Sequence, residues 1–372
     1  AVTGSVTVGG RLVPITAATT AAAQQPRSLG APTEFPAEFS SIRGLRALPD
    51  GRLVVTDQKE QRIHLLDFAK GTSKPLARSG QGPSEYQAVG TVQRDKGGGV
   101  AVYDPQQKRF LPIAANGSVQ DVRAVPNAPR AMTLVMGDGP DMYTMDTVGH
   151  IYTTAGGTPS SPQATRSIIR DGTKGPTTLA ELRLPESRRF EGGQGISMTR
   201  AVSFSPRDYW AVGADGWVAV VRASPYRIDW YPPTGQVVRG PTLTYEPLPV
   251  TEQDKKVVRD ETARMMSSGR PTATINGKSI RPPAVEPDFA DTKPPVTGRV
   301  ALIDEQGRLW VERSQPAGAA TSLLDVIDRT GAVVHRVTLP AGSRLVGFDR
   351  TSAYAARTDE DDLVHLQRFP LP

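Results

Sequence analysis

The sequence repeats a pair of tight glycine turns at a nearly constant spacing, and this repeat limits the possible folds more than any other feature. Each copy reads as two apolar strands around a first turn, followed by two more strands around a second turn. In the first copy, these turns are Pro49-Asp50-Gly51 and Lys70-Gly71. Glycine accepts the positive φ that tight hairpin turns require. The pattern therefore predicts a repeated unit of four short antiparallel strands.

Six copies of this unit can be recognised. The two turns within a copy lie 18 to 24 residues apart in the four clearest copies, whereas successive copies begin 44 to 91 residues apart. A constant unit with variable gaps indicates one supersecondary motif with loops inserted between its copies. Four-stranded sheets repeated around an axis form a β-propeller. We therefore predict an all-β, six-bladed β-propeller with four-stranded antiparallel blades. The alternative, a pair of β-sandwiches, predicts no constant interval between turns.

The ring of blades must close on itself, because the sixth copy has no evident fourth strand before Pro372. An N-terminal strand, either 35–39 or 5–15, is predicted to pair into the last blade and remove the open edges. Residues 37–372 then form the propeller, and residues 1–36 form an N-terminal extension and linker. Residues 241–295 form an insertion between the fourth and fifth blades.

The insertion contains one predicted short helix. Thr251 followed by Asp254 is typical of a helix N-terminus, and Gly269 is typical of its end. One face of the helix carries these side chains at helical spacing: Val257, Val258, Thr262, Met265 and Met266. This weakly amphipathic face either lies on the propeller itself or serves as a docking element, because methionine pairs suit adaptable contacts.

A short connector adds a family resemblance. Residues 80–86 read Gly-Gln-Gly-Pro-Ser-Glu-Tyr. The chain resembles the NHL-like six-bladed propellers of exported bacterial proteins, whose connector is Gly-x-Gly-Pro-Gly-Glu-Phe/Tyr, and Ser84 departs from it at the third glycine. The resemblance covers roughly residues 37–372. It implies the fold but not the chemistry, since most of these proteins have no assigned activity and a fold does not specify a function.

Composition excludes several classes of function. Because the chain has no cysteine, it forms no disulfide, no cysteine-ligated zinc site and no iron–sulfur cluster. The formal net charge of +6 comes mainly from scattered arginines, and nucleic-acid binders usually concentrate such charge on one face. No stretch of the sequence is apolar enough for a membrane helix. Residues 1–23 end in small residues like an export signal, so we predict an exported, periplasmic protein without a membrane span of its own.

No catalytic motif is complete in the sequence. Gly80 and Gly82 lack the last glycine and the following helix of a dinucleotide-binding loop, and no Gly-x-Ser-x-Gly occurs. Lactonase-like propellers hold a divalent ion through oxygen ligands at the starts of the innermost strands, but those starts here present arginine. We therefore predict no catalytic residue, no metal and no cofactor. The histidines are predicted to be structural: His64, His150, His335 and His365.

Three of these arginines, Arg43, Arg200 and Arg344, are predicted to line one channel mouth and to contact an anionic ligand or an acidic surface. The leading prediction is a non-catalytic platform that binds other protein subunits. It would be an extrinsic accessory subunit of a periplasmic-side membrane assembly, such as a respiratory or photosynthetic complex. The alternative is a propeller hydrolase, a lactonase or a small-ligand binder that uses the central channel. The candidate partner contacts are Arg43, Arg200, Arg344, Val258, Met265 and Met266.

Overall fold

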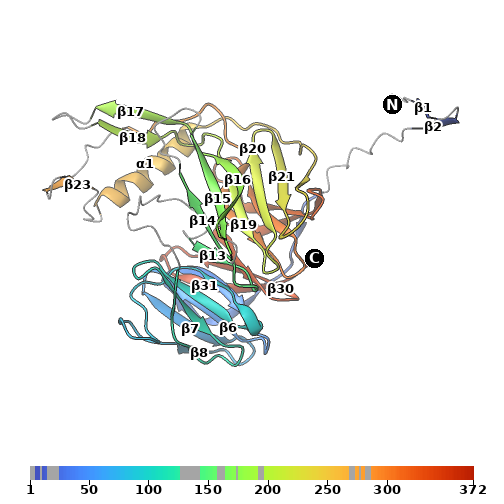
Figure 1. Ribbon diagram of the computed structural model, residues 1–372. Coiled ribbons are helices and arrows are strands. Elements are labelled where there is room, and N and C mark those ends of the chain that lie inside the picture. The colour runs from blue at the N-terminus through green and yellow to red at the C-terminus, as the bar shows by residue number, and fades with distance from the viewer. Residues whose placement is uncertain are drawn as a thin grey trace.

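The short apolar runs of the sequence form six sheets, which stand around a common axis as a β-propeller (Figure 1). The computed structural model describes residues 5–8, 11–14, 25–125, 143–156, 164–172, 175–191, 197–267, 273–275, 278–280 and 286–372. In Figure 1, blade 1 in blue and blade 4 in yellow lie on opposite sides of the ring. The predicted fold class is confirmed.

The first three blades follow the predicted strand order. Blade 1 consists of β5 (Ile42–Ala47), β6 (Leu53–Asp57), β7 (Arg62–Asp67) and β8 (Thr72–Pro75). Blade 2 consists of β9 (Val92–Arg94), β10 (Val100–Asp104), β11 (Arg109–Ile113) and β12 (Arg123–Ala124), with a 3₁₀ turn at Lys96–Gly98. Blade 3 consists of β13 (Tyr143–Met145), β14 (Ile151–Ala155), β15 (Thr165–Asp171) and β16 (Thr177–Arg183).

The last three blades repeat this order, and the N-terminal segment completes two of them. Blade 4 consists of β19 (Tyr209–Val212), β20 (Val218–Ala223), β21 (Tyr226–Tyr231) and β22 (Val238–Arg239). Blade 5 consists of β25 (Val296–Ile303), β26 (Leu309–Arg313), β27 (Thr321–Ile327), β28 (Val333–Pro340) and the short parallel strand β3 (Arg27–Ser28). Blade 6 consists of β29 (Ser343–Phe348), β30 (Ser352–Thr358), β31 (Val364–Pro370) and β4 (Thr33–Phe39).

The remaining described elements lie outside the blades. They are one helix, α1 (Glu252–Ser267), and three two-stranded hairpins. The hairpins are β1 (Ser5–Val8) with β2 (Arg11–Pro14), β17 (Ser187–Glu191) with β18 (Ser197–Ala201), and β23 (Ala273–Ile275) with β24 (Lys278–Ile280). In Figure 1, α1 and the β17–β18 hairpin project from the same side of the ring.

The hydrophobic core is divided into six clusters, one between each pair of neighbouring blades. Strands in the middle of a blade are therefore buried on both faces, and Val218 to Val221 are all fully buried. This burial explains why such strands read as continuous apolar runs rather than as an alternating pattern. Because each sheet buries its faces on its neighbours, a single blade could not be stable alone.

The N-terminal strand β4 closes the ring. It pairs antiparallel with β31, so the two ends of the propeller share blade 6. Phe35 and Phe39 are 2% and 5% exposed and pack between blades 6 and 1. Closure by the first of the two predicted segments is thus confirmed, whereas 5–15 contains the β1–β2 hairpin. Strand pairing also begins inside the predicted linker, because β3 pairs with β28.

Helix α1 begins where the sequence predicts. The Thr251 hydroxyl accepts a hydrogen bond from the Asp254 amide at 3.3 Å, and the Asp254 carboxylate accepts one from the Thr251 amide at 2.9 Å. Asp254 also forms a buried ion pair with Lys293 at 2.6 Å, and the Lys293 ammonium donates to the carbonyl of Gln315 in blade 5 at 2.7 Å. These contacts hold the start of the helix against its own propeller. The predicted end, Gly269, lies outside the described residues.

The family-like connector is a tight turn between blades 1 and 2. The Glu85 carboxylate folds back to accept a hydrogen bond from the Gly82 amide at 2.8 Å and to pair with Arg78 at 2.6 Å. A Cβ atom on Gly80 would lie 2.0 Å from a Glu85 carboxylate oxygen, so a larger residue here would displace the Glu85 side chain from its present position. Tyr86 is buried, and its hydroxyl donates to the loop between β6 and β7 at 3.0 Å. The connector therefore fixes one blade on the next.

We expect Phe35→Ala to lower the free energy of unfolding by about 3–5 kcal/mol, because it leaves a cavity under the strand that closes the ring. Denaturant titration followed by tryptophan fluorescence measures this loss. Thr33→Ala, at the exposed start of the same strand, is the control and should change stability by less than about 0.5 kcal/mol. Equal effects of the two substitutions would contradict closure of the ring by β4.

Candidate functional site

The innermost strands of the blades enclose a channel along the propeller axis. The strands β5, β9 and β13 contact one another in this order, as do β19, β25, β29 and β5. Two cavities, of about 120 Å³ and 130 Å³, lie along the channel. They are sections of one passage, because the same five side chains line both: Arg46, Gln93, Thr144, Val212 and Ile303.

The 120 Å³ cavity is strongly cationic. Its lining includes Arg43, Arg46, Arg299 and Arg344, which lie on the inner strands β5, β25 and β29. These strands belong to blades 1, 5 and 6, which are adjacent in the ring. No aspartate or glutamate is found among the described residues that line it. We call this section of the channel the arginine cavity.

β5 contributes two arginines to the same cavity and has a register shift at its start. The strand pairs with β6 at Ile42 and again at Gly44, so Arg43 is an extra residue in the ladder. Residues three apart in a regular strand point to opposite faces, and one inserted residue reverses that parity. Arg43 lies at this irregularity, whereas Arg46 pairs regularly opposite Val54, and both line the arginine cavity.

The inner strand of blade 5 bulges further. β25 pairs with β26 at Val296 and then only from Ala301 onward, so Arg299 lies in the unpaired stretch. Gly298 has a φ of +74°, and a Cβ atom on it would lie 1.9 Å from the Tyr209 ring. Only glycine fits this approach, so Gly298 allows the bulge that brings the exposed Arg299 to the channel.

Backbone carbonyl groups orient two of the arginines. The Arg344 guanidinium donates to the carbonyl of Ile42 at 2.6 Å, across the interface between blades 6 and 1. The Arg46 guanidinium donates to the carbonyl of Leu45 at 2.9 Å. Such bonds satisfy donors but do not neutralise charge. These two bonds orient the Arg46 and Arg344 guanidinium groups within the cavity.

Arg46 lies at the inner limit of the arginine cavity. Its burial, reinforced by the charge of Arg94, lowers the pKa of Arg46 to about 10, and the charge of Glu305 acts in the opposite direction. Because this pKa is well above neutral, the guanidinium is protonated at pH 7. The lowered pKa means that its surroundings compensate the charge only in part.

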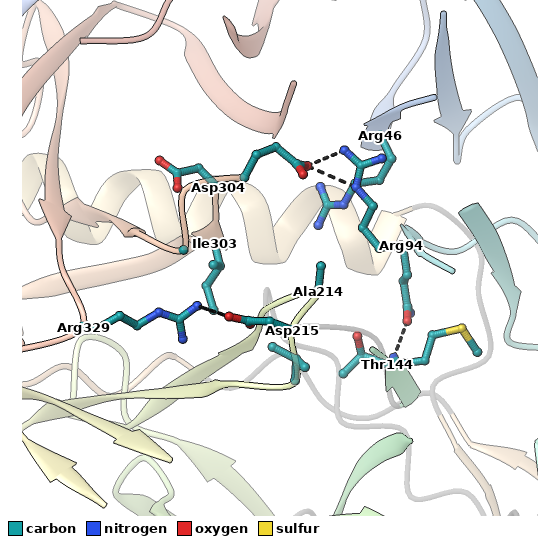
Figure 2. Close-up of a pocket in the computed structure, with 13 residues that line it drawn as sticks. Arg46, Arg94, Thr144, Ala214, Asp215, Ile303, Asp304 and Arg329 are labelled. Carbon is teal, nitrogen blue, oxygen red and sulfur yellow. Dashed lines mark hydrogen bonds and ion pairs between the residues drawn. The ribbon is translucent and has the colours of Figure 1, made fainter. Parts of the chain in front are cut away.

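The other end of the channel is crossed by ion pairs (Figure 2). Arg94 on β9 of blade 2 pairs with Glu305, which follows β25 of blade 5. Blades 2 and 5 face each other across the ring, so this pair crosses the axis. Arg329 pairs with Asp215 at 3.0 Å and links blades 5 and 4. Figure 2 shows both pairs beside the 130 Å³ cavity, with Arg46 next to Arg94.

A third cavity, of about 260 Å³, lies beside the arginine cavity between blades 6 and 1. Arg299 and Arg344 line both cavities, so the cationic site continues into this lateral space. The lining of this lateral cavity contains hydroxyl groups and charges of both signs, so it could accommodate a polar part of a ligand. The polar residues in addition to the two arginines are Ser40, Ser41, Lys59, Thr358 and Asp362.

A divalent cation does not fit this channel mouth. Calcium needs several oxygen ligands that converge on it, whereas the mouth presents guanidinium groups. In the described part of the chain, no group of three or more His, Cys, Asp or Glu side chains could hold a metal ion. A metal-dependent lactonase mechanism therefore has no support in the geometry of this site.

The structure brings together two of the three arginines predicted from sequence, since Arg43 and Arg344 line one cavity. Arg200 lies elsewhere, on β18 of the β17–β18 hairpin, and lines none of the three cavities. Sequence reasoning missed Arg46 and Arg299. A glycine beside Arg299 was an available signal, because glycine inside a strand often marks a bulge. Arg46 carries no such signal.

The other predicted positions lie away from the channel. Val258 is half-buried on α1, and the side chains of Met265 and Met266 lie outside the described part of the structure. None of the four histidines lines any of the three cavities. His365, for example, lies 3.0 Å from Glu34 and links β31 to the closing strand. A partner-binding role for α1 remains a prediction.

The chain was compared with known proteins. No protein-family model matches it, and no curated protein sequence is similar to it. Among solved structures, a protein of Bacteroides fragilis described as a putative exported protein has a TM-score of 0.47 at 12% identity, over 91% of this chain and 94% of that one. The virginiamycin B lyase of Staphylococcus aureus has a TM-score of 0.41 at 12% identity, over 92% and 99%. A protein described as a putative gluconolactonase has a TM-score of 0.43 at 11% identity, over 91% of each chain.

These similarities concern the fold alone. They agree with the six-bladed propeller that the family resemblance implied, but no comparison assigns the chain to the NHL-like family. The prediction that the protein is not an enzyme is corrected, because similar structures include a lyase and a gluconolactonase-type protein. A propeller without a familiar catalytic motif is therefore no ground for excluding catalysis.

The predicted location is tested only in part. One similar structure is that of a protein described as a putative exported protein, and none of the described helices has the length and apolar character needed to cross a membrane. The periplasm, the protein partners and the membrane assembly named from the sequence remain predictions.

We expect Gly298→Ala to destabilise the protein by at least about 2 kcal/mol, because the new methyl group would overlap the Tyr209 ring and adopt a left-handed backbone conformation. Thermal and denaturant unfolding measure the effect. Gly51→Ala is the matched control, because Gly51 has a φ of +86° with no atom within 4 Å of its Cβ position. That control should show only the backbone cost of about 1 kcal/mol. Equal losses would mean that the Tyr209 contact does not shape the bulge.

Proposed function

We propose that the protein binds a small organic anion in the arginine cavity. The observation that supports this function is the gathering of four arginines around one cavity with no carboxylate among the described lining residues. Like charges repel more strongly away from bulk water, so such a group is costly unless a ligand compensates it. Guanidinium groups bind carboxylates and phosphates through paired, charge-assisted hydrogen bonds.

The shape of the channel supports a small ligand that enters from one side. The Arg94–Glu305 pair crosses the axis at the end opposite the arginine cavity. The cavity volume of about 120 Å³ is well below that of pockets for drug-sized ligands. The lateral cavity between blades 6 and 1 shares Arg299 and Arg344, so larger polar groups on the ligand would extend into it.

This proposal covers both binding and chemical conversion of the anion. Guanidinium groups that hold an anion also stabilise negative charge that develops during a reaction. A test of this proposal therefore measures both the affinity for the anion and whether the anion is chemically converted. The alternative role predicted from sequence, a platform for protein subunits, has less support because the described start of α1 is anchored to its own propeller.

We expect millimolar acetate, butyrate, phosphate or succinate to raise the melting temperature of the full chain, because a ligand that binds only the folded state stabilises it. Arg299→Met should weaken the affinity of the best of these anions about tenfold or more, through loss of a charge-assisted contact. Isothermal titration calorimetry measures affinity, and NMR of the ligand after incubation reports conversion.

Arg350→Met is the matched control. It removes one positive charge from an exposed residue of blade 6 that lines none of the three cavities. Affinity should stay within about twofold of the wild type, since distant surface charges are screened by salt. Equal weakening by both substitutions would indicate a general effect of net charge and would contradict a site in the arginine cavity.

A further inference from the structure

The arginine cavity has two levels along the axis. The outer level contains Arg43, Arg299 and Arg344. Of these, Arg299 and Arg344 also line the lateral cavity. Arg46 lies at the inner level, where it also lines the 130 Å³ cavity. At about 3.3 Å per residue, and with one residue taken up by the register shift, Arg46 is roughly 7–10 Å deeper along β5 than Arg43.

The inner level contains a cation without a carboxylate partner. Arg46 forms no ion pair with a carboxylate of the described residues, and its guanidinium donates to the carbonyl of Leu45. Glu305, whose charge acts on Arg46, is already bonded to Arg94 through two guanidinium nitrogens. Buried charges in proteins are normally paired. The two other carboxylates that line the 130 Å³ cavity are also engaged, Asp215 with Arg329 and Asp304 with Arg308, so an anionic group of a ligand could pair with Arg46.

The wall between the two levels is uncharged. It consists of small and apolar side chains together with hydroxyl and amide groups, and it belongs largely to blades 2, 3 and 4. An uncharged chain of carbon atoms could lie along this wall without leaving a charge unpaired. The relevant lining residues are Thr91, Val92, Gln93, Thr144, Ala211 and Val212.

We propose that the ligand is a linear organic dianion that binds end-on in the channel. One anionic group binds Arg46 at the inner level, and the other binds Arg43, Arg299 and Arg344 at the outer level. A chain of roughly four to six carbon atoms matches two levels that are about 7–10 Å apart. Dicarboxylates are the simplest members of this class. The inference rests on the proposed function and specifies its ligand.

Calorimetric titration of the full chain with succinate, glutarate and adipate tests the proposal, with butyrate, valerate and hexanoate as monoanions of matched length. The wild type should bind its best dicarboxylate at least about tenfold more tightly than the matched monocarboxylate. Arg46→Met should abolish this preference, so that the dicarboxylate and its matched monocarboxylate bind within about threefold of each other. Arg350→Met should leave both affinities unchanged.

A second measurement does not depend on the folding of the Arg46 variant. The affinity of the wild type for the dicarboxylate should fall more steeply with added NaCl than its affinity for the monocarboxylate, because two ion pairs are screened rather than one. If the dicarboxylate and the monocarboxylate bind with equal affinity and equal salt dependence, while Arg299→Met still weakens binding, the proposal of a dianionic ligand is wrong and the proposed function still stands. Failure of every anion to bind would overturn both.

Discussion

Buried aspartates at the strand ends hold the innermost strands in place, and the channel depends on them. The Asp57 carboxylate at the end of β6 accepts hydrogen bonds from the amides of Ser40 and Ser41, at 2.8 and 3.2 Å. Asp104 holds the corresponding loop of blade 2 in the same way, at 2.8 and 3.2 Å. A hydrogen bond to a charged group contributes about 1.5–3 kcal/mol. Because β5 begins directly after Ser41, these two hydrogen bonds help to fix the position of Arg43, the first arginine of the channel.

At the opposite end of the blades, aspartates in the first hairpin turns also accept hydrogen bonds that hold the turns in place. In blades 3, 5 and 6, an aspartate in the first hairpin turn accepts hydrogen bonds from amides of its turn and from an aromatic side chain of the second strand. The aspartate–aromatic pairs are Asp146 with Tyr152, Asp304 with Trp310, and Asp349 with Tyr354. Asp304 directly precedes Glu305, so this pairing also positions the carboxylate that crosses the axis to Arg94.

The sequence was sufficient for the fold because the fold rests on local signals. Glycine turns, apolar runs and the cap at Thr251 each have a local cause, and the closing strand follows from the missing fourth strand of blade 6. The site was only half predictable. Arg43 and Arg344 were found as residues at strand starts, whereas Arg299 lies in an unpaired stretch of β25 that only the pairing of two strands reveals. Such an irregularity arises from the pairing of two strands and is not encoded in one of them.

Within the arginine cavity, the described lining has a charged side and an uncharged side. Register irregularities occur in β5, β25 and β29, which carry the arginines, whereas the pairings of β9, β13 and β19 with their neighbours are regular over the described residues. Blades 5, 6 and 1 therefore present guanidinium groups, and blades 2, 3 and 4 present an apolar and hydroxyl-bearing wall opposite them. An anionic molecule placed between these walls would turn its charged groups toward blades 5, 6 and 1. In the proposed complex, the strands with irregular pairing would orient the ligand, and the regular strands would supply the surface along which its carbon chain lies.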